Sequence, residues 1–205
     1  ALCRQAAPTM TVSTSPMTLA DYLAYDDGSE VEYELNQGEL VVMPPESERN
    51  RRITLFLLAY FLQQGVPLSQ LTMTTELVVS GARATVRRPD FMVLSAELAE
   101  ALTGATRSTV LMDMPPPRLV VEVVSPGKAN EDRDYRYKRS EYGARGIGEY
   151  WIVNPQRQQV TVLTWVDGFY EAESFEGQTS LNSVFLRELG TTVELTAAQV
   201  LCPMD

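Results

Sequence analysis

An unbroken apolar run with one carboxylate at its centre constrains this chain more than any other stretch. Residues 119–124 read LVVEVV, and such a run is typical of a strand buried on both faces of a sheet. Because side chains alternate along a strand, Glu122 shares one face with Val120 and Val124. An ionised carboxylate there is costly unless a positive group meets it. The sequence therefore predicts a cation beside Glu122 or, as the simpler alternative, a carboxylate that is half-exposed or paired with an arginine.

Two other segments carry the remaining groups of a candidate site. Asp90 stands at the head of a second apolar run. Carboxylates on two apolar strands indicate a cation held between them, and a turn aspartate is the alternative. On a helix expected over residues 130–144, Asp134, Lys138 and Tyr142 recur at every fourth residue and share one face. Lys138 is one of only two lysines, and its compact ammonium can polarise a water or meet developing negative charge during phosphate-ester hydrolysis.

The complete absence of histidine narrows the chemistry that this chain can perform. It excludes Ser-His-Asp and Cys-His catalysis, histidine zinc sites and histidine-based nucleases. Any metal has to be held by carboxylates, carbonyls and water, which favours Mg²⁺ (or Mn²⁺).

The distribution of charge is uneven along the chain. A net charge of −10 opposes general affinity for nucleic acids. The acidic excess, however, lies mostly before Arg49 and after Asp167, and the basic residues gather around the candidate site. We therefore predict a local basic cleft on an acidic protein, with DNA contacts from Arg49, Arg51, Arg52, Arg87, Arg88, Arg136 and Arg139.

Five segments, taken in order, resemble one protein family. The resemblance covers nearly the whole chain from Met17 onward, and it is to the Uma-two family of restriction endonucleases within the PD-(D/E)XK, or restriction-endonuclease-like, nuclease superfamily. The segments are YELNQGELVVMPPES (residues 33–47), RPDFMVL (88–94), LVVEVVSP (119–126), the D-x-x-x-K-x-x-x-Y spacing from Asp134 to Tyr142, and EYWIVNP (149–155).

The resemblance implies both a fold and an activity. The fold is a restriction-endonuclease-like α/β fold, a mixed β-sheet flanked by helices, here with an added N-terminal β-hairpin and C-terminal strands. The activity is that of a metal-dependent endonuclease that hydrolyses DNA with Mg²⁺ or Mn²⁺, and the protein is expected to be a homodimer. The alternative, favoured by the acidic balance and the missing histidine, is a nuclease-like scaffold without efficient catalysis that serves as a nucleic-acid- or protein-binding module.

Carried onto this chain residue by residue, the resemblance places two metal-binding carboxylates and a catalytic lysine in the segments above. We predict that the carboxylates and the main-chain carbonyl of Val123 hold one Mg²⁺. The lysine orients the attacking water or stabilises the charge that develops. The catalytic residues are Asp90, Glu122 and Lys138, and the residues that support the lysine are Asp134 and Tyr142.

The chain departs from the family pattern at two positions. The superfamily usually has its lysine two residues after the strand glutamate, where this chain has Val124; in this branch the lysine lies on the following helix, which fits Lys138. The branch also often has a histidine before its first long helix, where this chain has Asn50, which cannot carry a proton near neutral pH. In the N-terminal hairpin, Glu34 or Glu39 is expected to face the site as an accessory acid, unless both are exposed strand carboxylates.

Length and composition suit one domain. With 205 residues, of which 44% are hydrophobic, the chain can bury a sizeable core. We expect residues 1–16 to be a flexible leader and residues 17–205 to form a single domain. Cys3 and Cys202 show neither metal-binding spacing nor a disulfide framework, which favours a cytoplasmic location. No apolar stretch reaches the length of a membrane span, so no membrane contact is expected.

Hydrophobic periodicity and turn residues predict the order of elements. Expected helices cover residues 18–25, 47–64, 95–102, 130–144 and 197–201, and residues 103–117 are expected to be a loop. Expected strands cover residues 33–35, 39–43, 71–80, 84–94, 119–124, 150–153 and 160–166, with a last strand after Asp167 and Gly168.

Overall fold

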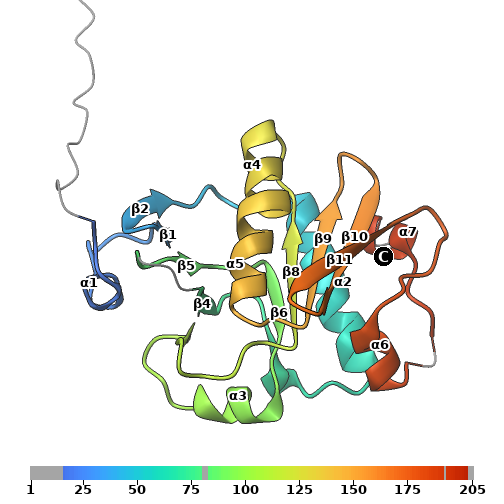
Figure 1. The fold of residues 1–205 in the computed structure, drawn as a ribbon, viewed down its shortest axis with the longest axis horizontal. Coiled ribbons are helices and arrows are strands. Elements are labelled where there is room, and N and C mark those ends of the chain that lie inside the picture. Colours follow the sequence, from blue (N-terminus) through green and yellow to red (C-terminus); the bar gives the residue numbers. More distant parts are fainter. Residues whose placement is uncertain (1–15, 80–82, 192, 203–205) are drawn as a thin grey trace, which may run out of the picture.

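Two mixed β-sheets and the helices around them make up the computed structural model, which describes residues 16–79, 83–191 and 193–202 (Figure 1). The larger sheet has the strand order β11-β10-β9-β8-β6-β3, and the smaller has the order β2-β1-β5-β4-β7. The strands are β1 (Tyr33–Asn36), β2 (Glu39–Val42), β3 (Leu71–Thr72), β4 (Glu76–Val78), β5 (Val86–Arg87), β6 (Phe91–Val93), β7 (Thr109–Val110), β8 (Leu119–Val123), β9 (Glu149–Asn154), β10 (Gln159–Val166) and β11 (Phe169–Glu176). The α-helices are α1 (Leu19–Leu23), α2 (Glu48–Gln63), α3 (Ala96–Ala101), α4 (Lys128–Asp132), α5 (Arg139–Ala144), α6 (Val184–Leu189) and α7 (Ala197–Leu201). The predicted class, a mixed α/β fold with flanking helices, is confirmed.

Strand β8 lies inside the larger sheet and is buried along its whole length, as its apolar run predicts. It pairs antiparallel with β6 and parallel with β9. A parallel pair needs a long crossover, usually helical, and residues 128–144 supply it. The register sets Phe91 opposite Val121, so Asp90, which directly precedes β6, comes to the end of β8 that carries Glu122.

The two long strands expected over residues 71–80 and 84–94 are each divided between the sheets, which corrects the prediction of a single sheet. The first segment gives β3 in the larger sheet and β4 in the smaller; the second gives β5 in the smaller and β6 in the larger. Pro89 lies at the second break, where a residue without an N–H cannot continue a ladder. Residues 103–117 are also more than a loop, because they contain β7, which pairs with β4. Ser80 lies outside the described residues.

The crossover helix has three consecutive parts. A π-helical segment, Arg133–Lys138, connects α4 to α5. The helix begins two residues before the expected start, after Gly127 at φ +113°, a conformation that glycine adopts without a Cβ penalty. π-Helical turns are rare and concentrate at functional sites, so this part of the helix marks a place to look for function.

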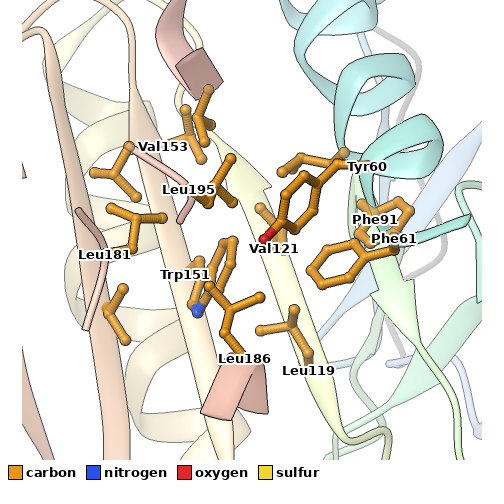
Figure 2. Close-up of a cluster of buried hydrophobic side chains, with 14 of the residues drawn as sticks. Tyr60, Phe61, Phe91, Leu119, Val121, Trp151, Val153, Leu181, Leu186 and Leu195 are labelled. Carbon is orange, nitrogen blue, oxygen red and sulfur yellow. The ribbon is translucent and has the colours of Figure 1, made fainter. Parts of the chain in front are cut away.

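Helices cover both faces of the larger sheet (Figure 1). On one face, Leu57 and Phe61 of α2 join Phe91 and Trp151 in a buried cluster (Figure 2), and Phe61 stacks on Phe91 with ring centroids 5.7 Å apart. Helix α2 therefore packs against the sheet, and Trp151 is part of this packing. The other face packs against the crossover helix through a second cluster that includes Val120, Val124, Tyr142 and Tyr150.

Several expectations concern parts of the chain that the structure does not describe. Residues 1–15 of the expected leader, including Cys3, lie outside the described residues, whereas Cys202 is exposed. Helix α6 was not expected from the sequence; Ser183 caps its first turn. Within residues 16–79, 83–191 and 193–202, no helix is long and apolar enough to cross a membrane. The cytoplasmic location stays a prediction.

Candidate active site

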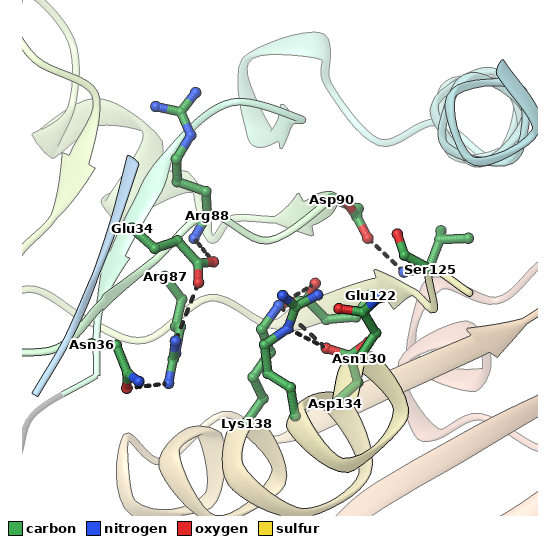
Figure 3. Close-up of polar contacts among 12 residues, drawn as sticks. Glu34, Asn36, Arg87, Arg88, Asp90, Glu122, Ser125, Asn130, Asp134 and Lys138 are labelled. Atoms are coloured by element: carbon green, nitrogen blue, oxygen red, sulfur yellow. Dashed lines mark hydrogen bonds and ion pairs between the residues drawn. The ribbon is translucent and has the colours of Figure 1, made fainter. Parts of the chain in front are cut away.

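The two predicted carboxylates meet where β6 begins and β8 ends. Asp90 Oδ2 accepts a hydrogen bond of 2.6 Å from the main-chain N–H of Val123, so the aspartate is fixed to the strand that carries Glu122 (Figure 3). Asp90 Oδ1 makes no hydrogen bond within the described part of the chain. Both carboxylates line the same cleft, and one oxygen of Asp90 remains available to whatever enters it.

Glu122 contacts the crossover helix on the face that carries Asp134, Lys138 and Tyr142, as their spacing of four residues predicts. Its Oε2 lies 2.7 Å from Lys138 Nζ, and its Oε1 accepts a hydrogen bond of 2.5 Å from the Tyr142 hydroxyl. Lys138 Nζ also lies 3.5 Å from Asp134 Oδ1. The Lys138 side chain is only 1% exposed, so its ammonium group is held between two carboxylates. The predicted cation beside Glu122 is therefore a lysine.

The pKa values of Asp90, Glu122 and Lys138 are shifted, because these groups lie close together and are withdrawn from solvent. Burial raises the pKa of Asp90 to about 6, although the Lys138 ammonium and the Val123 N–H oppose the rise. Burial also raises the pKa of Glu122; Lys138 lowers it, and Asp90 and Asp134 raise it further. For Lys138, burial lowers the pKa, but Glu122 and Asp134 outweigh burial and leave the pKa raised. The ammonium form is thus the stable form of Lys138 in this site.

We expect an Asp90→Asn variant to flatten the pH dependence of stability of the metal-free protein. Because folding raises the Asp90 pKa from 3.8 to about 6, the folded chain holds the proton in the window between these values. The stabilisation from Asp90 is therefore complete below about pH 4 and lost as the pH rises through about 6, a loss of no more than about 3 kcal/mol.

Denaturant unfolding in EDTA at about pH 4 and about pH 7 measures this effect. Asp90→Asn should gain stability relative to the wild type as the pH rises, because asparagine has no proton to lose; the charged groups that interact with Asp90, namely Lys138, Asp134, Glu46 and Glu122, remain in the variant. An equal difference between the two proteins at both pH values would contradict the assignment.

A cleft of about 670 Å³ opens over these groups. Its floor contains Asp90, Glu122 and Lys138, and its wall includes Arg88 and Arg133. Further acidic residues also line it, so the local basic cleft predicted from the sequence is of mixed charge. These acidic residues are Glu30, Glu32 and Glu46.

The sequence places the chain in a known family. A family model described as "Uma2: Putative restriction endonuclease" matches residues 19–195. The chain belongs to the Uma2 family. This match confirms the resemblance carried by the five sequence segments.

A likeness to a solved structure supports the Uma2 fold. The chain is similar to a protein described as a "putative nuclease belonging to DUF820 from Anabaena variabilis ATCC 29413", with a TM-score of 0.67 and 14% sequence identity. The likeness covers 91% of this chain and 98% of that chain. At this identity it establishes the fold alone. The comparison with curated proteins found no match.

The oxygen donors in this Uma2 cleft suit a hard divalent cation. Asp90, Glu122 and the carbonyl of Val123 are all oxygen donors, which Mg²⁺ and Mn²⁺ prefer. Within the described ranges, no group of three or more His, Cys, Asp or Glu side chains is placed to hold a metal ion. Two carboxylates and a carbonyl fit Mg²⁺ nonetheless, because this ion usually keeps several waters and takes one or two protein carboxylates.

Asn50 stands at the position where the family resemblance implies a histidine, and its contacts show what the asparagine does. It lies in the first turn of α2, which Ser47 caps. Its Nδ2 donates to the main-chain carbonyl of Val123 at 3.2 Å and approaches Ser125 Oγ at 3.5 Å. Asn50 therefore ties α2 to the end of β8 and holds the predicted metal-binding carbonyl of Val123 in place.

The structure corrects two predictions made for the N-terminal half of the chain. Arg87 is 3% exposed and is enclosed by Glu34, 3.2 Å away, and Glu141, 2.7 Å away. This burial contradicts the prediction that Arg87 contacts DNA. Glu34 is buried too, and its other oxygen accepts from the Arg88 N–H, so both of its oxygens are engaged; its supporting role stays a prediction. Glu39 is exposed on β2 and does not line the cleft, so it is not an accessory acid.

The other arginines predicted to contact DNA lie at different distances from the cleft. Arg88 lines it and pairs with Glu32 at its rim. Arg139 does not line the cleft; it donates to the Tyr170 carbonyl on β11. Contacts of DNA with the remaining arginines stay predictions. These exposed residues are Arg49, Arg51 and Arg52 at the start of α2, where the last two pair with Glu48, and Arg136 on the crossover helix.

Sequence reasoning gave Arg133 no role in the site, although this residue lines the cleft. In an α-helix, residues five apart are separated by about 140° around the axis, so helical spacing does not place Arg133 on the face that carries Lys138, although both belong to one basic cluster in the sequence. A π-helix joins residues five apart by its hydrogen bonds, and Arg133–Lys138 is such a segment. The helical irregularity therefore brings a second cation to the cleft.

Proposed function

We propose that this Uma2 protein is a Mg²⁺- or Mn²⁺-dependent endonuclease of PD-(D/E)XK type that hydrolyses DNA phosphodiester bonds. The observation that carries this proposal is the convergence of Asp90, Glu122 and Lys138 on one cleft from two adjacent strands and the crossover helix. Family membership supports the same class of reaction.

Each residue has a separate part in the proposed reaction. Asp90, through the oxygen that makes no hydrogen bond, Glu122 and the Val123 carbonyl would hold the metal ion. When bound, the ion lowers the pKa of a water and neutralises charge on the phosphate. Lys138 keeps its proton and therefore acts as a fixed positive charge, which orients the attacking water or stabilises the charge that develops. Tyr142 fixes the Glu122 carboxylate by donating to Oε1.

The acidic lining of the cleft makes the proposed activity strictly dependent on a divalent cation. Phosphate binding rests on neutralising positive charge, and without metal the cleft contains Glu30, Glu32 and Glu46 besides the two catalytic carboxylates. We expect nicking of supercoiled DNA in Mg²⁺ or Mn²⁺ and none in EDTA. Single-stranded DNA as a second substrate shows which strand form is cleaved.

Calorimetric titration with Mn²⁺ separates the nuclease from the alternative function. The alternative, a nuclease-like scaffold that binds nucleic acid or protein, is favoured by the net charge of −10 and by the ion pair that engages Glu122. Mn²⁺ binding together with metal-dependent nicking supports the enzyme. Neither binding nor nicking at millimolar metal and neutral pH would leave the scaffold as the function.

A homodimer is part of the proposal and rests on the family resemblance. Light scattering of the purified protein tests it, and a monomer at all concentrations would contradict it.

A further inference from the structure

Arg133 differs from the other cations of the cleft in which of its nitrogens contact carboxylates. Lys138 is enclosed by Glu122 and Asp134, and Arg88 holds Glu32 at 2.8 Å through a terminal nitrogen. Arg133 contacts Asp134 Oδ1 only through Nε, at 3.3 Å, which is long for a charge-assisted hydrogen bond. Its two terminal nitrogens make no hydrogen bond or ion pair with the described residues.

Arg133 lies where a substrate that enters the cleft can reach it. Its side chain is 29% exposed and lines the same cleft as the two catalytic carboxylates. Asp134 Oδ1 holds both Arg133 Nε and Lys138 Nζ, so one buried carboxylate orients two cations. A guanidinium that is held at Nε presents its remaining N–H groups as a planar fork, which matches the oxygens of a phosphate.

We propose that Arg133 binds a non-bridging oxygen of the DNA phosphate that enters the cleft. This inference rests on the proposed function, which it deepens by naming the residue that recognises the phosphate. The acidic residues of the cleft repel a phosphodiester everywhere except near its cations, and Lys138 and Arg88 are already paired with carboxylates. Arg133 therefore contributes two terminal nitrogens that no described residue engages, and it stands in the π-helical segment.

Binding of a short DNA duplex in Ca²⁺, measured over a range of salt concentrations, tests this assignment without requiring cleavage. Arg133→Gln should weaken binding about 10- to 100-fold, as expected when a charge-assisted hydrogen bond is lost. It should also reduce the slope of log affinity against log salt by about 1, because one phosphate contact disappears. Arg133→Lys should recover the slope, since it restores the charge, but only part of the affinity, since it lacks the fork.

Arg187→Gln is the matched control. It removes the same charge from an exposed position on α6, which does not line this cleft, so affinity and salt slope should stay at wild-type values. Thermal unfolding of each variant shows whether it is folded. If Arg133→Gln does not fold, the comparison of Arg133→Lys with the wild type decides, since only a fork-specific contact lowers its affinity at an unchanged slope.

Parallel cleavage assays in Mg²⁺ distinguish a failure of the Arg133 assignment from a failure of the proposed nuclease function. If the wild type cleaves and Arg133→Gln binds and cleaves like it, the role of Arg133 is wrong and the nuclease stands. If binding depends on Arg133 but the wild type never cleaves, the phosphate contact stands and the nuclease is wrong. If the wild type does not bind DNA at all, the phosphate contact is wrong as well.

Discussion

A Glu122→Gln variant is expected to lose DNA cleavage by about 1000-fold or more while its free energy of unfolding stays within about 1 kcal/mol of the wild type. The loss of activity follows from the loss of a metal-binding carboxylate. Stability is kept because a buried carboxylate without its metal is costly to hold ionised, as the burial-raised pKa of Glu122 reflects, and glutamine removes this charge while keeping the shape of the side chain. The change also brings the carboxylates of Asp90 and Asp134 into balance with the cations of Lys138 and Arg133.

Calorimetric titration with Mn²⁺ and denaturant unfolding measure the two halves of this prediction. A variant that binds Mn²⁺ and cleaves DNA like the wild type would show that Glu122 is no metal ligand. A loss of several kcal/mol in stability, with metal binding never seen in either protein, would show that the pair of Glu122 and Lys138 is structural.

Glu149→Gln is the matched control for this prediction. Glu149 is another buried glutamate, on the neighbouring parallel strand β9, but it does not line the cleft. It accepts hydrogen bonds from the Trp151 side chain, the Ser183 hydroxyl and two main-chain N–H groups at the start of α6. Glutamine cannot accept all of them, so this variant should lose about 2–4 kcal/mol of stability and keep its cleavage rate per folded molecule.

A Lys138→Met variant is expected to lose both stability and activity. In the metal-free protein the change leaves Asp90, Glu122 and Asp134 without the ammonium that contacts two of them, while Arg133 still contacts Asp134, and an uncompensated buried charge costs about 3–5 kcal/mol. Cleavage should fall by about 100-fold or more, because a fixed charge at the developing negative charge is lost. Mn²⁺ should still bind, and it should stabilise the variant more than the wild type, because the ion replaces the missing positive charge.

The other lysine of the chain supplies the control for Lys138→Met. Lys128 is exposed at the start of α4, so Lys128→Met should change neither stability nor cleavage measurably. Thermal unfolding with and without Mn²⁺, together with plasmid nicking, compares the two variants. If Lys138→Met cleaves DNA like Lys128→Met, the lysine has no part in the reaction.

Local sequence patterns were sufficient for the centre of the candidate site. The apolar run around Glu122 indicates a buried strand, and the strand is buried. Asp134, Lys138 and Tyr142 are spaced four residues apart, which places them on one face of a helix, and that face contacts Glu122. These inferences hold because side-chain direction repeats with a fixed period along strands and helices, so the residues that share a face can be read from spacing alone.

The periphery of the site could not be read in the same way. Arg87 and Arg88 are adjacent arginines in the sequence, yet Arg87 is enclosed by Glu34 and Glu141, whereas Arg88 lines the cleft. Glu34 and Glu39 lie on paired strands, yet only the first is buried beside the site. Neighbouring residues on a strand point to opposite faces, but which face receives the helix is decided by the docking of distant segments.

The sequence by itself determined the class of fold, the buried strand with its carboxylate, the helix face that neutralises it and the absence of histidine chemistry. The tertiary structure alone decided that two expected strands divide between two sheets, that Arg87 is structural and that Arg133 joins the cleft through a π-helical segment. The physical reason is the sequence separation over which each kind of interaction acts. Periodicity and composition act over a few residues, whereas the partner of a buried charge and the course of a strand depend on packing between segments 50 or more residues apart, as between Arg87 and Glu141.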